Sequence, residues 1–148
     1  MESRIIVCPA CGQLNRAPLD RLQRRLAPQC GGCHAPLFDG HPVSIRDEAM
    51  FDRMISRNQI PVLVDFWASW CGPCLAMAPQ FEAAAGQAEP LVRLAKLDTE
   101  AVPSVAARFG IRSIPTMILF RGGREAARRA GAMDARSILG WLNEAGAT

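Results

Sequence analysis

The stretch Val62-Leu63-Val64-Asp65-Phe66-Trp67-Ala68-Ser69-Trp70-Cys71-Gly72-Pro73-Cys74 places two cysteines, three residues apart, directly after an apolar run. The run predicts a buried strand, and the residues from Cys71 onward predict a helix. Residues i and i+3 are neighbours on a helical turn, within the Cα separation of roughly 5.5 Å that a disulfide needs. The sulfur of Cys71 would lie at the helix N-terminus, where unpaired N–H groups and the macrodipole stabilise an anion. We therefore expect a reactive pair in which Cys71 is readily a thiolate.

The chain has six cysteines, and all of them fall into Cys-x-x-Cys pairs. No apolar run approaches the roughly 20 residues needed to cross a bilayer. The first residues contain no apolar segment long enough for a signal peptide, so we expect an intracellular, cytoplasmic protein without a membrane partner. Because structural disulfides are rare in that compartment, metal binding and redox catalysis are the two uses to expect for the cysteines.

The first forty residues are dense in Cys, Gly and Pro and predict a zinc site. Cys8-Pro9-Ala10-Cys11 and Cys30-Gly31-Gly32-Cys33 are separated by eighteen residues, which fits a site with two cysteine turns. A unit of this size buries too little apolar surface to fold unaided, and a tetrahedral Zn²⁺ supplies the missing free energy. We expect one structural Zn²⁺ per chain, held by Cys8, Cys11, Cys30 and Cys33. His34 is an alternative fourth ligand, or simply a surface histidine.

The net charge of +3 is only weak evidence for a polyanionic partner. Residues 1–40 contain five arginines and three acidic residues, and residues 41–148 contain twelve basic and eleven acidic residues. Four thiolates around one Zn²⁺ would add two negative charges and cancel the excess in the first segment. We therefore do not expect a nucleic-acid partner.

From Pro42 onward, apolar periodicity predicts alternating strands and helices that end in a hairpin and a helix. This order indicates an α/β or α+β domain with three layers. The expected elements are a strand at 43–45, a helix at 47–57, a strand at 61–67, a helix from 71 to about 87, a strand at 91–97, a short helix from 103 to 109, strands at 116–120 and 124–130, and a helix after Asp134.

Residues 41–148 resemble the thioredoxin family throughout. The residues that carry the resemblance, in the family's order and spacing, are 64–74 around the dithiol, Pro79, Lys96, 109–116 and Gly131. The cysteine-rich extension makes the chain similar to the thioredoxin-2 class of bacterial thioredoxins. The resemblance implies a thioredoxin fold, with a central mixed five-stranded sheet flanked by four helices, in residues 41–148. A small zinc-ribbon domain, residues 1–40, would precede it.

In this resemblance Cys71 attacks a substrate disulfide and Cys74 resolves the mixed disulfide. We expect Cys71 to be the more exposed of the two. Asp65 lies in an apolar strand, where burial should raise its pKa. The matching aspartate of the family helps to deprotonate the resolving thiol, and Lys96 matches the lysine that influences it. Two alternatives stay open: Asp65 could only bind a backbone N–H, and the dithiol could be a second zinc site, although further cysteines are lacking after Cys74.

The resemblance also implies a cis peptide at Ile114–Pro115 and a shallow substrate groove beside the cysteines. Its expected residues are Trp70, Gly72, Pro73, Ser113, Ile114, Pro115, Ala130, Gly131 and Ala132. The implied activity is a thioredoxin-type protein-disulfide reductase that binds no flavin or nicotinamide itself. Its expected partners are disulfide-containing proteins and an NADPH-dependent flavoenzyme, thioredoxin reductase, and the chain is expected to be a monomer.

Two features leave alternatives for the ribbon and for specificity. Arg21, Arg24 and Arg25 could make the ribbon a binding module for nucleic acid or protein, and oxidation that ejects zinc could make it a redox-sensitive chaperone. Leu75 departs from the family, in which many members carry a lysine directly after the second cysteine. The dithiol therefore lacks one positive charge beside it.

Overall fold

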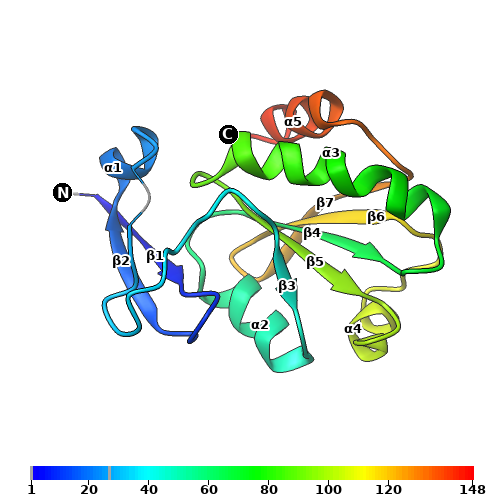
Figure 1. The fold of residues 1–148 in the computed structure, drawn as a ribbon, viewed down its shortest axis with the longest axis horizontal. Helices are drawn as coiled ribbons and strands as arrows, with labels where there is room; N and C mark the ends of the chain where they lie inside the picture. Colours follow the sequence, from blue (N-terminus) through cyan, green and yellow to red (C-terminus); the bar gives the residue numbers. More distant parts are fainter. Residues whose placement is uncertain (1, 27) are drawn as a thin grey trace.

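The structure, a computed structural model, describes residues 2–26 and 28–148, which form a small N-terminal unit and a larger layered domain (Figure 1). None of the helices in these residues is both long and apolar enough to span a membrane. The elements in chain order are β1 (Ser3–Val7), β2 (Leu14–Pro18), α1 (Leu19–Gln23), β3 (Val43–Ile45), α2 (Glu48–Arg57), β4 (Val62–Trp67), α3 (Gly72–Ala88), β5 (Arg93–Asp98), α4 (Pro103–Arg108), β6 (Thr116–Arg121), β7 (Arg124–Ala130) and α5 (Ala135–Glu144).

The larger domain is a three-layer structure around a mixed sheet of order β3-β5-β4-β6-β7. β4 runs parallel to β5 and antiparallel to β6, so it lies at the centre. Helices α3 and α5 cover one face of the sheet, and α2 and α4 cover the other (Figure 1). The predicted fold class, a five-stranded mixed sheet flanked by four helices, is confirmed.

Strand β4 is buried on both faces, as its continuous apolar sequence predicts. Leu63 packs with α3 and α5, whereas Val62, Val64 and Phe66 pack on the opposite side. The period of two in a strand therefore assigns Asp65 to the same face as Leu63, beneath the helix that begins at the dithiol.

Local signals set the ends of the elements. The Asp47 side chain accepts the Met50 N–H at 2.8 Å, and the Asp134 side chain accepts the Ser137 N–H at 2.8 Å, so both act as helix N-caps. Gly122 and Gly123 both have positive φ, which a two-residue hairpin turn requires.

One boundary differs from prediction, because β5 begins at Arg93 and not at Leu91. The N–H groups of Leu91 and Val92 both bond to the carbonyl of Ala88, in a turn that closes α3. These residues therefore belong to the turn that follows α3 and not to the strand.

The N-terminal unit packs directly on the larger domain. Gln59 N–H donates to the Ile5 carbonyl at 2.8 Å, and Val7 N–H donates to the Asn58 side chain at 2.8 Å. Ile60 and Leu91 of the larger domain complete the apolar cluster of the small unit. The small unit therefore gains from its neighbour part of the core that forty residues cannot build alone.

A buried arginine of the larger domain also joins the two parts and belongs to an ion pair. Arg93 of β5 is 1% exposed and donates to the Leu37 carbonyl at 2.6 Å, and its guanidinium lies 4.1 Å from the centre of the Phe38 ring. One guanidinium nitrogen lies 3.6 Å from the carboxylate of Glu89, at the end of α3. This pair was not predicted from the sequence, although an arginine within the apolar run 91–97 and a glutamate four residues earlier were a visible signal.

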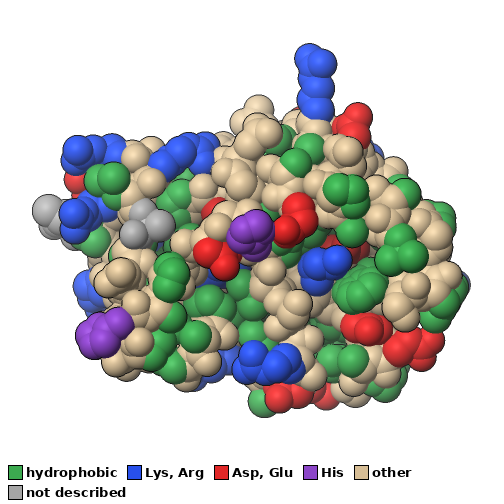
Figure 2. All heavy atoms as spheres, viewed as in Figure 1, with side chains coloured by type: hydrophobic (Ala, Val, Ile, Leu, Met, Phe, Trp, Pro, Cys, Tyr) green, Lys and Arg blue, Asp and Glu red, His purple; other side chains and the backbone are tan. Residues whose placement is uncertain are grey.

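The basic residues of the N-terminal unit are not all available to a partner. Figure 2 shows several basic side chains over the region of α1, and a mixture of basic and acidic side chains over the rest of this face. Arg25 donates to the carbonyls of Gln87 and Glu89 at 2.5 and 3.0 Å, at the C-terminal end of α3. Its positive charge therefore lies at the negative end of the α3 dipole, and its two hydrogen bonds join the N-terminal unit to the larger domain.

Candidate active site and metal centre

Cys71 and Cys74 lie where the end of β4 meets the start of α3, as predicted. They form a disulfide with a Cα separation of 5.3 Å. Cys71 is the N-cap of α3, and its sulfur accepts the backbone N–H of Cys74 at 3.2 Å. This hydrogen bond and the helix dipole both favour negative charge on Cys71.

Cys71 is the more exposed cysteine, as expected, but the difference is small. Cys71 is 4% exposed and Cys74 is 2% exposed, so both are buried in the disulfide form. What distinguishes the two is the position of Cys71 at the cap, since only its sulfur accepts the helix N–H. Helix geometry therefore distinguishes the two sulfurs more clearly than exposure does.

Asp65 is a buried carboxyl group beneath the dithiol helix. Burial raises its pKa to about 7, against the opposing attraction of Lys96. Neither carboxylate oxygen has a hydrogen-bond partner within the described residues, so the alternative in which Asp65 binds a backbone N–H is not supported. Cys74 is a buried residue of α3, the helix that packs on the same face of the sheet. This arrangement suits a group that exchanges a proton near neutral pH.

Lys96 is paired with Asp65 in the register of the parallel strands β4 and β5. Its ammonium group lies 4.5 Å from the centre of the Trp67 ring, which holds the lysine under the site by a cation–π contact. The structure therefore brings the two predicted charged residues together.

The predicted groove residues lie in three segments near the dithiol. The Ile114–Pro115 peptide is cis, as predicted, and the Ile114 carbonyl lies 3.7 Å from the Cys71 sulfur. Gly131 N–H donates to the Pro115 carbonyl at 2.9 Å, which brings the loop after β7 to this carbonyl. The exposed members of the predicted groove are Trp70, Gly72, Pro73, Ser113, Ala130, Gly131 and Ala132.

Trp70 is 69% exposed, which is unusual for a tryptophan. Its indole N–H donates to the carboxylate of Glu100 at 2.7 Å. Glu100 is a site residue that was not predicted from the sequence, because nothing in its local pattern links it to Trp70, thirty positions earlier. The Glu100 carboxylate fixes the indole ring beside the dithiol, and most of the Trp70 side chain stays exposed to solvent.

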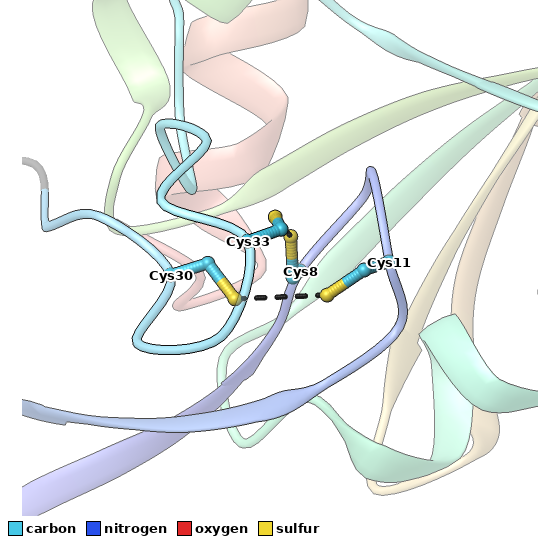
Figure 3. A group of neighbouring side chains, drawn as sticks. All are labelled: Cys8, Cys11, Cys30 and Cys33. Atoms are coloured by element: carbon cyan, nitrogen blue, oxygen red, sulfur yellow. Dashed lines mark hydrogen bonds between the residues drawn. The ribbon is translucent and has the colours of Figure 1, made fainter.

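The other four cysteines form one cluster (Figure 3). Their sulfur atoms all lie within 4.8 Å of one another, and none is in a disulfide. Cys8 and Cys33, and likewise Cys11 and Cys30, have sulfurs 3.7 Å apart. A tetrahedral site with Zn–S bonds of about 2.3 Å has edges of about 3.8 Å, so the four sulfurs fit a zinc ion.

Two similar turns build this cluster. Gly12 N–H bonds to the Cys8 carbonyl at 2.9 Å, and His34 N–H bonds to the Cys30 carbonyl at 3.0 Å. Both Gly12 and His34 adopt positive φ, so each lies at the same place in its turn. His34 is exposed and is not part of the cluster, so the candidate metal ligands here are the four cysteines.

Hydrogen bonds stabilise negative charge on one sulfur of the cluster, that of Cys30. At Cys33 the Ala35 N–H acts in the same direction, but burial and the neighbouring thiols raise its pKa to about 11. The N–H groups of Cys33 and Gly32 and the side-chain amide of Asn15 lower the pKa of Cys30 to about 6, although burial acts in the opposite direction. Asn15 and Gly32 donate to this sulfur at 3.5 and 3.4 Å. Such outer contacts orient metal ligands, and the part of Asn15 was not predicted from the sequence.

Two family models match the chain. The thioredoxin model matches residues 42–144, and the model described as thioredoxin 2, N-terminal matches residues 7–35. The second match contains all four clustered cysteines.

Known proteins match over similar ranges. Thioredoxin C-3 of Corynebacterium nephridii is 44% identical over 140 residues, which cover 95% of this chain and 94% of that protein. The bifunctional thioredoxin reductase/thioredoxin of Mycobacterium leprae is 42% identical over 105 residues, 71% of this chain and 23% of that protein. The solved structure of a mutant thioredoxin from Halobacterium salinarum matches with a TM-score of 0.65 and 28% identity, covering 72% of this chain and 92% of that one.

Proposed function

Because the chain belongs to the thioredoxin family and is a thiol–disulfide oxidoreductase, we propose that Cys71 and Cys74 carry out its reaction on protein disulfides. The observation that carries this proposal is the capping of α3 by Cys71, whose sulfur accepts the Cys74 N–H. A second thiol lies one turn further along the same helix, and a buried carboxyl group lies below it.

The first step is attack by the Cys71 thiolate on one sulfur of the substrate disulfide. The substrate S–S bond breaks, one substrate sulfur leaves as a thiolate, and Cys71 is joined to the other in a mixed disulfide. The helix N-terminus stabilises the attacking anion. The open backbone at Ile114 and the exposed groove residues position an extended substrate segment beside Cys71.

The second step is attack by Cys74 on the sulfur of Cys71. Cys74 first gives its proton to Asp65, which is partly ionised near neutral pH because its pKa is about 7. The bond between Cys71 and the substrate breaks, the second substrate sulfur leaves as a thiolate, and the Cys71–Cys74 disulfide remains. Two electrons have passed to the substrate, and Lys96 keeps part of the Asp65 population ionised.

Asp65→Asn is expected to stabilise the fold at alkaline pH and to slow the second step. The pKa of Asp65 is about 7 in the folded protein, above the ordinary value of 3.8. Ionisation of Asp65 therefore destabilises the fold. This destabilisation grows as the pH rises from about 4 to 7 and reaches its full size above pH 7. Replacing the ionisable carboxyl group by an amide should raise the free energy of unfolding by up to about 4 kcal/mol at pH 8, with little change at pH 4.

Urea unfolding at the two pH values tests the effect on stability, and single-turnover release of substrate from the mixed disulfide tests the effect on rate. An equal gain in stability at pH 4 and pH 8 would show that burial of the ionised carboxylate is not its source.

We also propose that the cluster holds one structural Zn²⁺ per chain, with Cys8, Cys11, Cys30 and Cys33 as its ligands. Support comes from the spacing of the sulfurs and from the match of residues 7–35 to the N-terminal model. When bound, the ion supplies folding energy to the ribbon and no redox chemistry, since Zn²⁺ has none.

Cys8→Ser is expected to lose the zinc and to loosen the ribbon, because Cys8 is a buried ligand at the end of β1. Metal analysis should find one zinc per chain in the parent and less than about a tenth of that in the variant. His34→Ala is the control and should keep its zinc. Full zinc content in Cys8→Ser would remove this cysteine from the ligand set.

The domains, partners and location follow from the same proposal. Residues 1–40 form the zinc ribbon and residues 41–148 the thioredoxin domain, and the chain acts as a cytoplasmic monomer. A flavin-dependent thioredoxin reductase returns two electrons from NADPH to the Cys71–Cys74 disulfide. The occurrence of a reductase and a thioredoxin in one Mycobacterium leprae protein supports this partner.

The experiment that tests the proposed function is reduction of insulin disulfides, coupled to NADPH through a thioredoxin reductase. The full chain should turn over repeatedly, with consumption of one NADPH per disulfide. A protein that retains its Cys71–Cys74 disulfide in the presence of reductase and NADPH, and reduces no insulin when dithiothreitol replaces them, would refute the proposal.

A further inference from the structure

A cavity of about 230 Å³ lies between the first cysteine turn of the ribbon and helix α2. Val7, Pro9 and Ala10 contribute one apolar wall, and Met50 and Met54 contribute the other. Small-molecule sites are frequently found where two parts of a chain meet, and methionine side chains adapt to the shape of an apolar group. The proposed redox reaction uses none of these residues.

Two arginines, Arg46 and Arg53, line the same cavity, whereas no acidic residue does so among the described residues. The Arg53 Nε donates to the Gly12 carbonyl at 2.6 Å, which fixes this guanidinium and leaves its terminal nitrogens for another acceptor. Arg46 is exposed and has no hydrogen-bond or ion-pair partner within residues 2–26 and 28–148. The cavity therefore combines an apolar wall with a positive one.

The carboxylates of the first turns of α2 are engaged elsewhere. Glu48 and Asp52 accept hydrogen bonds from Arg108 of α4 at 3.1 and 2.8 Å. Asp47 caps the helix by accepting the Met50 N–H. These acids are therefore bound to partners other than the two arginines of the cavity.

We propose that this cavity binds a compact apolar group that carries a carboxylate. The apolar part lies against Met50 and Met54, and the carboxylate accepts charge-assisted hydrogen bonds from Arg46 and from the terminal nitrogens of Arg53. A small alkyl carboxylate and the C-terminal apolar residue of a polypeptide share this chemistry.

The zinc centre gives the same arginines a competing role. Four thiolates and one Zn²⁺ carry two negative charges, and Cys8 and Cys11 line the cavity. If the guanidiniums serve only to balance that charge, their removal should speed zinc loss and should leave carboxylate binding unaffected. If they form a carboxylate site, their removal should weaken binding and leave the zinc in place.

The test is a titration of the zinc-loaded full chain, followed by NMR of its methionine methyl groups. The probes are N-acetyl-L-leucine, its amide N-acetyl-L-leucinamide, and 4-methylpentanoate. We expect the methyl signals of Met50 and Met54 to shift with both acids, and the uncharged amide to bind at least about tenfold more weakly. Tighter binding of N-acetyl-L-leucine indicates a polypeptide C-terminus, and tighter binding of 4-methylpentanoate indicates a free carboxylate.

Arg46→Gln should weaken binding of the acids at least about fivefold, while zinc content and insulin reduction stay unchanged. Arg57→Gln, in the last turn of α2, removes an equal charge from a residue that does not line the cavity and should have no effect. Equal binding of acid and amide, unshifted methionine signals, or faster zinc release from Arg46→Gln with unchanged binding would each overturn the proposal.

Discussion

Cys71→Ser should lose insulin reduction by at least about three orders of magnitude, because a serine hydroxyl at the helix cap does not ionise near neutral pH. The fold should be unaffected, since serine is also a good N-cap and can accept the same Cys74 N–H. The rate of insulin precipitation, measured with dithiothreitol as the electron source, gives the activity directly.

Cys74→Ser separates the two steps of the reaction. It leaves the Cys71 thiolate intact and removes the thiol that resolves the mixed disulfide, so the variant should stop after one attack. Mass spectrometry should find substrate attached to Cys71 in Cys74→Ser, and none attached to Cys74 in Cys71→Ser. Repeated turnover by either variant would contradict the assigned order of attack.

Arg93→Ala should lower the free energy of unfolding by about 3–5 kcal/mol, which is the usual cost of leaving one partner of a buried ion pair alone. The loss has three parts: the ion pair with Glu89, the hydrogen bond to the Leu37 carbonyl and the stacking on Phe38. Because Leu37 and Phe38 lie between the cysteine turns and β3, the ribbon should loosen as well. Urea unfolding and amide exchange at Val7 measure the two effects.

The size of this effect should depend on pH. Burial raises the pKa of Glu89 to about 7, above the ordinary value of 4.5, and Arg93 opposes this rise. Without the arginine, the pKa of the folded Glu89 rises further. The folded protein then loses more free energy of unfolding than the parent does as the pH rises from 5 to 8. Arg93→Ala should therefore be more destabilised at pH 8 than at pH 5.

A double variant provides the control for the ion pair. Glu89→Gln with Arg93→Met removes both charges, and we expect it to recover part of the lost stability at pH 8. Arg57→Ala removes an exposed arginine and should change stability by less than about 0.5 kcal/mol. An equal loss of stability at pH 8 in Arg93→Ala and in the double variant would show that the charge on Glu89 does not contribute.

The layered domain could be predicted from sequence because its signals are local. The apolar run of β4, the two glycines after β6 and the aspartates at 47 and 134 each determine a strand, a turn or a helix start within a few residues. The grouping of the cysteines could be predicted as well. All three pairs have the same internal spacing, but two of them lie eighteen residues apart in a short segment and the third directly follows an apolar strand.

The packing of the ribbon on the larger domain could not be predicted in this way. It depends on Asn58, Gln59 and Arg93 meeting residues more than fifty positions earlier in the chain. The low exposure of Cys71 and the bond between Trp70 and Glu100 likewise arise from tertiary packing. Local pattern carries little information about such contacts, because each partner taken alone resembles an ordinary surface or strand residue.

We expect four of the six cysteines to hold zinc and the other two to exchange electrons. Native mass spectrometry of the reduced and the oxidised full chain, with alkylation mapping of free thiols, tests it in one measurement. We predict one zinc in both forms, alkylation of the reduced protein at Cys71 and Cys74, and one new disulfide between them on oxidation. Loss of zinc when that disulfide forms, or alkylation of Cys8 or Cys30 in the folded zinc-loaded protein, would contradict it.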